Sequence, residues 1–156
     1  MEPLRIREAT SAEDLAAVHR LFLAYANSLG ISLCFQNFEQ ELAGLPGAYA
    51  PPAGCLLLAE FDGVAGGCVA LRPLRNQVSE MKRLFVSPEF RGSGAGRILA
   101  HSIIAKAKSL GYQAIRLDTL PSMSAAIKMY ESLGFQPIEP YYENPVPGAM
   151  FLECKL

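Results

Sequence analysis

Three glycines at alternate positions, in the segment 86–97 (Val-Ser-Pro-Glu-Phe-Arg-Gly-Ser-Gly-Ala-Gly-Arg), separate an extended run from a helical one. The run 81–86 predicts a strand that Pro88 ends. Apolar residues at helical spacing predict a helix from Arg97, closed by Gly111. Because glycine tolerates positive φ and carries no side chain, such a turn can aim several N–H groups at one point. With the N-terminus of a helix behind it, the turn predicts a phosphate or pyrophosphate site.

The type of phosphate ligand follows from the spacing of this loop. It lacks the Gly-Lys-Ser/Thr of nucleotide P-loops, and Gly-x-Gly-x-Gly is one residue short of the dinucleotide fingerprint. For the glycines alone, a tight turn without any ligand is the alternative. The pattern Arg91-x-x-Gly94-x-Gly96 resembles the coenzyme A loop of the GNAT superfamily of N-acetyltransferases, Arg/Gln-x-x-Gly-x-Gly/Ala. That resemblance implies acetyl-CoA as the co-substrate.

The rest of the chain predicts one α/β domain over residues 1–156. In the first half we expect a strand at 4–7, a helix opened by a capping box at Thr10–Glu13 and ending near 29, a helix at 35–42 and a loop at 43–54. Strands at 55–61 and 64–71, joined at Asp62-Gly63, and a strand at 78–86 precede the glycine loop and its helix. After that helix we expect a strand at 113–120, a helix capped by Ser122 or Ser124 and ending near 133, and strands at 135–138 and 149–155. This order predicts a mixed, mostly antiparallel sheet of about seven strands with helices on both faces. It resembles the GNAT (acyl-CoA N-acyltransferase) fold from end to end.

Charge and cysteine content exclude several other classes of protein. The 14 Lys and Arg residues against 15 Asp and Glu residues give no electrostatic case for nucleic acid. No apolar run has membrane-spanning length, and the first residues lack the apolar core of a signal peptide, so we expect a cytoplasmic protein without a membrane partner. The cysteines (Cys34, Cys55, Cys68 and Cys154) form no Cys-x-x-Cys pair, which predicts buried thiols and no metal site.

Acetyl transfer to an amine requires a base, because an alkyl ammonium with a pKa near ~10.4 is almost fully protonated at neutral pH. Glu80 is the candidate base, since it begins the strand that leads into the glycine loop and resembles the catalytic glutamate of GNAT enzymes in placement. A surface glutamate paired with Lys82 or Arg83 is the alternative. A water chain in place of Glu80 is also open.

The candidate acid is Tyr130. The stretch from Ala126 to Phe135 resembles the second GNAT signature, Ala-x-x-x-Tyr-x-x-x-Gly-Phe, in which the tyrosine hydroxyl lies near the thioester sulfur. A phenol with a pKa of about 10 can protonate a departing thiolate and is itself protonated at rest. The alternative is a core aromatic side chain with its hydroxyl bonded elsewhere.

The resemblance also implies contacts to the cofactor and to the acceptor. The residues expected to bind the cofactor are Leu84, Phe85, Val86, Arg91, Gly92, Ser93, Gly94, Ala95, Gly96, Arg97 and Ser124. The first three are expected to pair with the pantetheine arm through their backbones, like an added strand. Met123 stands where relatives often carry an asparagine, which makes Ser124 the nearby candidate. Tyr141 and Tyr142 lie where relatives place a substrate-side loop, so either amine recognition or loop packing is expected.

The sequence thus predicts an acetyl-CoA-dependent N-acetyltransferase that acts on a primary amine of a small molecule or peptide by direct attack in a ternary complex. A catalytically silent acyl-CoA-binding sensor or regulatory module is the alternative, because it needs the loop but not Glu80 or Tyr130. A homodimer is possible. The acceptor has no motif, although Glu39, Glu41 and Glu143 hint at a cationic one.

Overall fold

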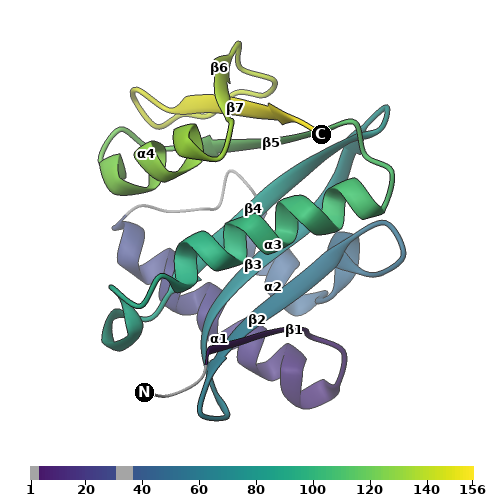
Figure 1. Ribbon diagram of the computed structural model, residues 1–156, viewed down its shortest axis with the longest axis vertical. Helices are drawn as coiled ribbons and strands as arrows, with labels where there is room; N and C mark the ends of the chain where they lie inside the picture. Colours follow the sequence, from purple (N-terminus) through teal and green to yellow (C-terminus); the bar gives the residue numbers. More distant parts are fainter. Residues whose placement is uncertain (1–3, 31–36) are drawn as a thin grey trace.

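The computed structural model describes residues 4–30 and 37–156, which form one sheet with helices on both faces (Figure 1). The sheet has seven strands within this part of the chain, in the order β1-β2-β3-β4-β5-β7-β6. The elements are β1 (Leu4–Glu8), α1 (Ala12–Leu29), α2 (Phe38–Ala43), η2 (Gly47–Tyr49), β2 (Cys55–Phe61), β3 (Val64–Arg75), β4 (Val78–Val86), η3 (Pro88–Phe90), α3 (Ala95–Ser109), β5 (Ala114–Thr119), α4 (Ser124–Ser132), β6 (Gln136–Ile138) and β7 (Met150–Lys155). The predicted fold class is confirmed.

The pairing of β4 with β5 shapes the middle of the sheet. It is parallel, whereas the other neighbouring strands pair antiparallel, and it ends at the pair Glu80–Arg116. Beyond that pair the two strands diverge, and the sheet opens as a wedge between them (Figure 1). Arg83 has a φ of +62°, and the register with β3 shifts between Cys68 and Ala70, so a bulge interrupts β4 beside the wedge.

Two apolar clusters cover the two faces of the sheet. Leu99, Ile103 and Ala107 of α3 pack on one face, and Tyr130 of α4 belongs to the same cluster. On the other face Val18, Leu21 and Phe22 of α1 pack with Phe38 of α2 and Tyr49 of η2. Each helix therefore buries one stripe, as its 3.6-residue period predicts. The predicted loop at 43–54 contains the short helix η2, which places Tyr49 in the core.

Several predicted helix ends differ from those observed. The capping box uses Ser11 and Asp14, one residue later than predicted, because Arg7 of β1 also holds the Asp14 carboxylate. Helix α3 begins at Ala95 instead of Arg97, since Gly94 is already its N-cap.

Helix α4 starts after Met123 with no side-chain cap, so the predicted caps Ser122 and Ser124 are wrong. The predicted start of the second helix at 35 lies outside the described residues, as does Cys34. The thiols of Cys55, Cys68 and Cys154 are free and buried, as predicted.

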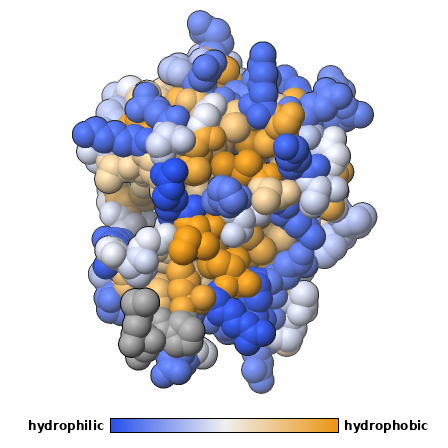
Figure 2. All heavy atoms as spheres, viewed as in Figure 1, coloured by the Kyte–Doolittle hydropathy of each residue, from blue (hydrophilic) through white to orange (hydrophobic). Residues whose placement is uncertain are grey.

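Apolar side chains gather in the middle of the face that carries α3, and hydrophilic ones surround them (Figure 2). Ile98 and Leu110 of α3 are among the large apolar side chains that are exposed. A homodimer stays a prediction. The described residues include no helix that is both long and apolar enough to cross a membrane.

Candidate active site

The wedge between β4 and β5 contains a cavity with a wide part and a narrow part. The wide part measures about 480 Å³ and the narrow part about 50 Å³. Residues lining both parts join them into one groove: Tyr25, Leu29, Leu84, Leu120 and Met123. The groove exists because β4 and β5 stop pairing after Glu80 while both strands continue.

The wide part runs along the end of β4 toward the glycine loop. Leu84, Phe85, Val86 and Arg91 line its β4 side, and residues 122–126 line its other side. The structure therefore brings the three predicted backbone contacts and Ser124 to one groove. In their β4 segment, Phe85 and Val86 pair with β3 on one edge only, because β5 has already diverged.

The glycine loop follows directly after Arg91, which lines the wide part. Gly92 and Gly94 have φ values of +85° and +87°, and a Cβ added at either one would meet open space. Gly96 lies in the first turn of α3, which follows directly. The Ser93 hydroxyl accepts a hydrogen bond from the Ala95 N–H at 3.3 Å. Open backbone in front of a 15-residue helix is the geometry that the sequence predicted for a pyrophosphate site.

The two arginines of the loop point in different directions. Arg91 donates from Nε to the Val86 carbonyl at 3.0 Å and lies 5.7 Å from the centroid of the Phe85 ring. It therefore sits at the groove. Arg97 donates to the Ser132 hydroxyl of α4 at 2.6 Å, and it is not among the residues that line the wide part.

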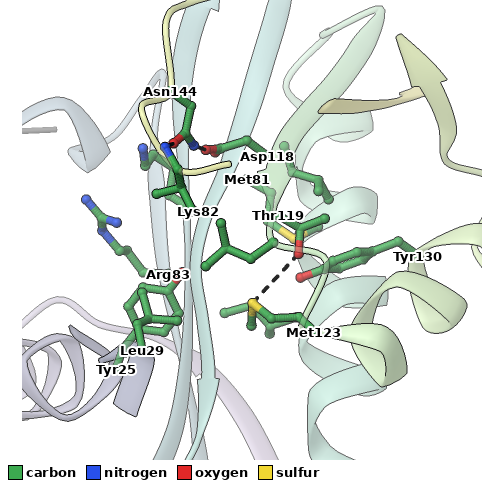
Figure 3. Close-up of a pocket in the computed structure, with 14 residues that line it drawn as sticks. Tyr25, Leu29, Met81, Lys82, Arg83, Asp118, Thr119, Met123, Tyr130 and Asn144 are labelled. Carbon is green, nitrogen blue, oxygen red and sulfur yellow. Dashed lines mark hydrogen bonds between the residues drawn. The ribbon is translucent and has the colours of Figure 1, made fainter. Parts of the chain in front are cut away.

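Tyr130 lines the narrow part, and its hydroxyl points toward Thr119 and Met123 (Figure 3). The side chain is buried, with an edge-to-face contact to Phe135 at 5.6 Å between centroids. Burial raises the pKa of the Tyr130 phenol above its ordinary value, so the hydroxyl keeps its proton at neutral pH. A protonated phenol at the narrow end suits the predicted acid.

Glu80 is buried in the sheet, so the alternative prediction of a surface glutamate is wrong. Its side chain is 1% exposed, and its Oε1 accepts bonds from Arg72 at 2.8 Å. Its Oε2 accepts a bond from the Tyr141 hydroxyl at 2.7 Å. Glu80 forms an ion pair with Arg72, which lies opposite it on β3. Glu80 is not among the described residues that line either part of the groove.

The segment between β6 and β7 ties the two diverging strands together. Tyr141 donates to Glu80 of β4, whereas Tyr142 and Asn144 both donate to Oδ2 of Asp118 on β5. The rings of Tyr141 and Tyr142 also pack on Phe151, at 5.1 and 5.4 Å between centroids. These contacts are those of the predicted loop packing, whereas amine recognition by Tyr141 and Tyr142 stays a prediction.

The sequence analysis missed three charged residues that line the narrow part, namely Lys82, Arg83 and Asp118. Arg83 is buried and makes two 2.9 Å bonds to Glu41. Lys82 is 9% exposed, and burial lowers the pKa of its ammonium. The signal was present in the sequence, because charged residues inside an otherwise apolar strand need a partner or a function.

No group of His, Cys, Asp and Glu side chains suited to a metal ion occurs in residues 4–30 and 37–156. His19 and His101 are both exposed on helices.

Residues 15–135 match the model of the Acetyltransferase (GNAT) family, and the chain belongs to that family. It is 40% identical over 146 residues to an uncharacterised N-acetyltransferase of Schizosaccharomyces pombe, covering 92% of this chain and 90% of that one. It is 32% identical over 126 residues to N-acetylaspartate synthetase of Danio rerio, covering 80% of this chain but 45% of that one. The crystal structure of a PaiA N-acetyltransferase from Thermoplasma acidophilum in complex with coenzyme A shares the fold, with a TM-score of 0.73, 19% identity and 99% of each chain covered.

Proposed function

We propose that the protein transfers the acetyl group of acetyl-CoA to a primary amine of a small molecule or peptide, by direct attack in a ternary complex. One observation carries this proposal. A single groove leads from Arg91, the residue just before the glycine loop, along the unpaired edge of β4, to the buried Tyr130. That path has the order of the cofactor itself, from diphosphate through pantetheine to thioester.

The loop and the wide part hold the cofactor in this proposal. The diphosphate lies against the N–H groups of residues 92–96, with Arg91 beside it, because helix N-termini and glycine turns bind such anions. The pantetheine arm pairs with the backbone of residues 84–86 like an added strand, and Ser124 faces it from the opposite wall. A backbone N–H of this strand then polarises the acetyl carbonyl.

The reaction begins when the base takes a proton from the acceptor ammonium. The neutral amine attacks the carbonyl carbon, so that the new C–N bond forms and the C–S bond breaks. The electron pair of the broken bond stays on sulfur, which receives the Tyr130 hydroxyl proton. The nitrogen loses its second proton to water, and water reprotonates Tyr130. Burial keeps Tyr130 protonated before this step.

Glu80 is the proposed base, and it acts through water in this scheme. Direct contact with the acceptor is disfavoured, because Arg72 and Tyr141 already bond to its two oxygens. Those same contacts favour a second candidate function, a silent acyl-CoA-binding module, since a carboxylate held for structure does not need to move protons. Both functions require the loop.

Thiol release from acetyl-CoA separates the two candidates. The assay offers a panel of primary amines, including amino acids because one relative is named N-acetylaspartate synthetase. Calorimetric titration with coenzyme A is run in parallel. Binding together with amine-dependent thiol release supports the transferase, and binding without release from any amine supports the silent module. Failure to bind coenzyme A refutes both.

A further inference from the structure

Asp118 is a carboxylate that lines the narrow part of the groove, the same part that Tyr130 lines. It lies on β5 two residues beyond Arg116, which forms the last β4–β5 pair with Glu80. Because β4 has diverged at this point, residues 117–120 of β5 border the cavity (Figure 3). The sheet therefore places a carboxylate where the two strands separate.

Two neutral donors hold this carboxylate in one orientation. Tyr142 donates to Oδ2 of Asp118, and the Asn144 amide donates to the same oxygen at 3.0 Å. Oδ1 accepts no hydrogen bond within the part of the chain that the structure describes. No buried side-chain oxygen in that part of the chain lacks a partner, so Oδ1 is accessible from outside the protein. One oxygen orients Asp118, and the other is open to a ligand.

The charge of Asp118 is not neutralised by an ion pair. Among residues 4–30 and 37–156, none of the ion pairs includes it. Arg116, the nearest cation on the same face of β5, is paired with Glu153 at 2.7 Å. The Lys82 ammonium on β4 attracts Asp118 only at longer range. A partly buried carboxylate in this state stabilises a cation that enters the cavity, because water screens the attraction less there than in bulk.

Asp118 and Tyr130 reach the narrow part from opposite faces of the sheet. Tyr130 packs in the same cluster as Leu117, and side chains alternate along a strand, so Asp118 lies on the other face. Burial raises the pKa of Tyr130, and the charges of Tyr25 and Asp118 raise it further, so the Asp118 carboxylate lies near the phenol. Because the nitrogen attacks the same carbon that the sulfur leaves, a sulfur at Tyr130 places the nitrogen on the Asp118 side.

We propose that Oδ1 of Asp118 binds the acceptor ammonium in the narrow part and stabilises the positive charge on its nitrogen during the transfer. This inference rests on the proposed function and adds a residue that touches the acceptor at the same site. After Glu80 has taken one proton through water, the nitrogen attacks and becomes cationic again in the tetrahedral intermediate. Asp118 accepts a hydrogen bond from that nitrogen until the C–S bond breaks and the second proton passes to water.

Asp118→Asn tests the charge with little change in shape. The amide oxygen of asparagine still accepts the bonds from Tyr142 and Asn144, so a purely structural role would be retained. For the panel amine with the highest kcat/KM, we expect this ratio to fall about 10- to 100-fold with a higher KM, the factor that a hydrogen bond to a charged group provides. Glu143→Gln removes the same charge from an exposed residue outside the narrow part, and it is expected to change kcat/KM less than about twofold.

A binding measurement separates recognition of the charge from turnover. Protein saturated with coenzyme A has no acetyl group to transfer, so that amine and the alcohol with the same carbon skeleton both bind without reacting. Calorimetric titration is expected to show about tenfold tighter binding of the amine in the wild type and in Glu143→Gln, and no preference in Asp118→Asn. Coenzyme A affinity and Tm are expected to be the same in all three proteins.

Two results overturn the inference while acetyl transfer stands. One is equal binding of the amine and the alcohol by the wild type, and the other is an Asp118→Asn variant that keeps both the preference and the wild-type kcat/KM. A wild type that binds coenzyme A but acetylates no amine overturns the proposed function, and the role of Asp118 fails with it.

Discussion

At the scale of single residues, Tyr130 has the most specific proposed role. Tyr130→Phe removes one hydroxyl and keeps the ring that packs on Phe135, so the fold is preserved. We expect kcat to fall about 100-fold, because a positioned acid contributes a factor of about 10²–10⁴, while the KM of the amine changes little. Tyr112→Phe is the matched control, because the Tyr112 hydroxyl lies outside the groove and donates to the Ala53 carbonyl, with 2.6 Å between the two oxygens. Unchanged kcat in Tyr130→Phe contradicts the acid role.

Glu80 is tested by its dependence on pH. Glu80→Gln keeps the size of the side chain but cannot take a proton. If the carboxylate is the base, kcat/KM falls about 100-fold or more and the acidic limb of the pH profile disappears. Loss of stability with an unchanged pH profile assigns Glu80 to the ion pair with Arg72 alone. Arg72→Gln, which disturbs the same pair but leaves the carboxylate in place, is the comparison variant.

Asp14 links the stability of the fold to pH. Its carboxylate bonds to Arg7 and to the N–H groups of Thr10 and Ser11, and the hydrogen bonds from Arg7, followed by that from Thr10, hold its pKa below the ordinary value. A lowered pKa in the folded state means that this stabilisation is fully present above the unfolded pKa of about 3.9 and is lost as the pH falls below it. We expect Asp14→Asn to reduce the free energy of unfolding by about 2 kcal/mol at neutral pH.

Urea denaturation at several pH values measures that effect. The gap between the wild type and Asp14→Asn is expected to narrow progressively as the pH falls from about 5 toward 2, because the Asp14 carboxylate of the unfolded chain binds a proton there while the lowered pKa keeps the folded one ionised. A gap that stays constant over this range contradicts the assignment. Comparing the two proteins at each pH cancels the other groups that titrate in the same range.

At the scale of elements, the turn that starts α3 requires glycine at position 94 but not at position 96. Gly94 has a φ of +87°, whereas Gly96 is helical and a Cβ there would lie 3.8 Å from Val86. Gly94→Ala is expected to lower the free energy of unfolding by about 1–2 kcal/mol. It should also weaken coenzyme A binding, because the loop N–H groups lose their common direction. Gly96→Ala is expected to leave stability unchanged or to raise it by up to about 1 kcal/mol. Equal stability of the two variants excludes this account.

The order of the elements was predictable because most of it depends on local signals. Asp62 and Gly63 have φ values of +51° and +82°, as the Asp-Gly hairpin signal required, and strand β2 spans the predicted residues. The predicted element boundaries were wrong where a contact with a residue distant in the sequence determines the local structure. Arg7 of β1 moved the capping box to Asp14, and Tyr49 turned part of a predicted loop into buried structure.

The glycine loop of the candidate site was predictable, because a sequence motif specifies its backbone positions. The cavity was less predictable, because it forms where two strands diverge. Nothing local shows that β4 and β5 stop pairing after Glu80, so the cavity lined by Lys82 and Asp118 could not be found from spacing. Glu80 belongs to the last β4–β5 pair before the divergence, and it lies buried with Arg72. The parts of the site that the sequence did not predict depend on the register between distant strands, which residue type alone does not reveal.

At the scale of the whole molecule, the wedge divides the sheet into two parts. The strands β1 to β4 lie on one side, and β5, β7 and β6 lie on the other, joined in parallel between residues 78–80 and 114–116. A ligand in the wide part contacts β4 on one wall and the start of α4 on the other. Coenzyme A is therefore expected to hold the two parts together.

Thermal unfolding and hydrogen exchange test this expectation. At 100 times its Kd a ligand adds about 2.7 kcal/mol to the free energy of unfolding, which raises the Tm by about 5–10 °C in a domain of this size. Pantetheine, which has the arm without the diphosphate, is expected to raise it much less, because the glycine loop then contributes nothing. Exchange is expected to slow at residues 84–86 and at 122–126 together. Protection of the loop without protection of 122–126 means that the cofactor binds outside the wedge, and the assignment of the groove is then wrong.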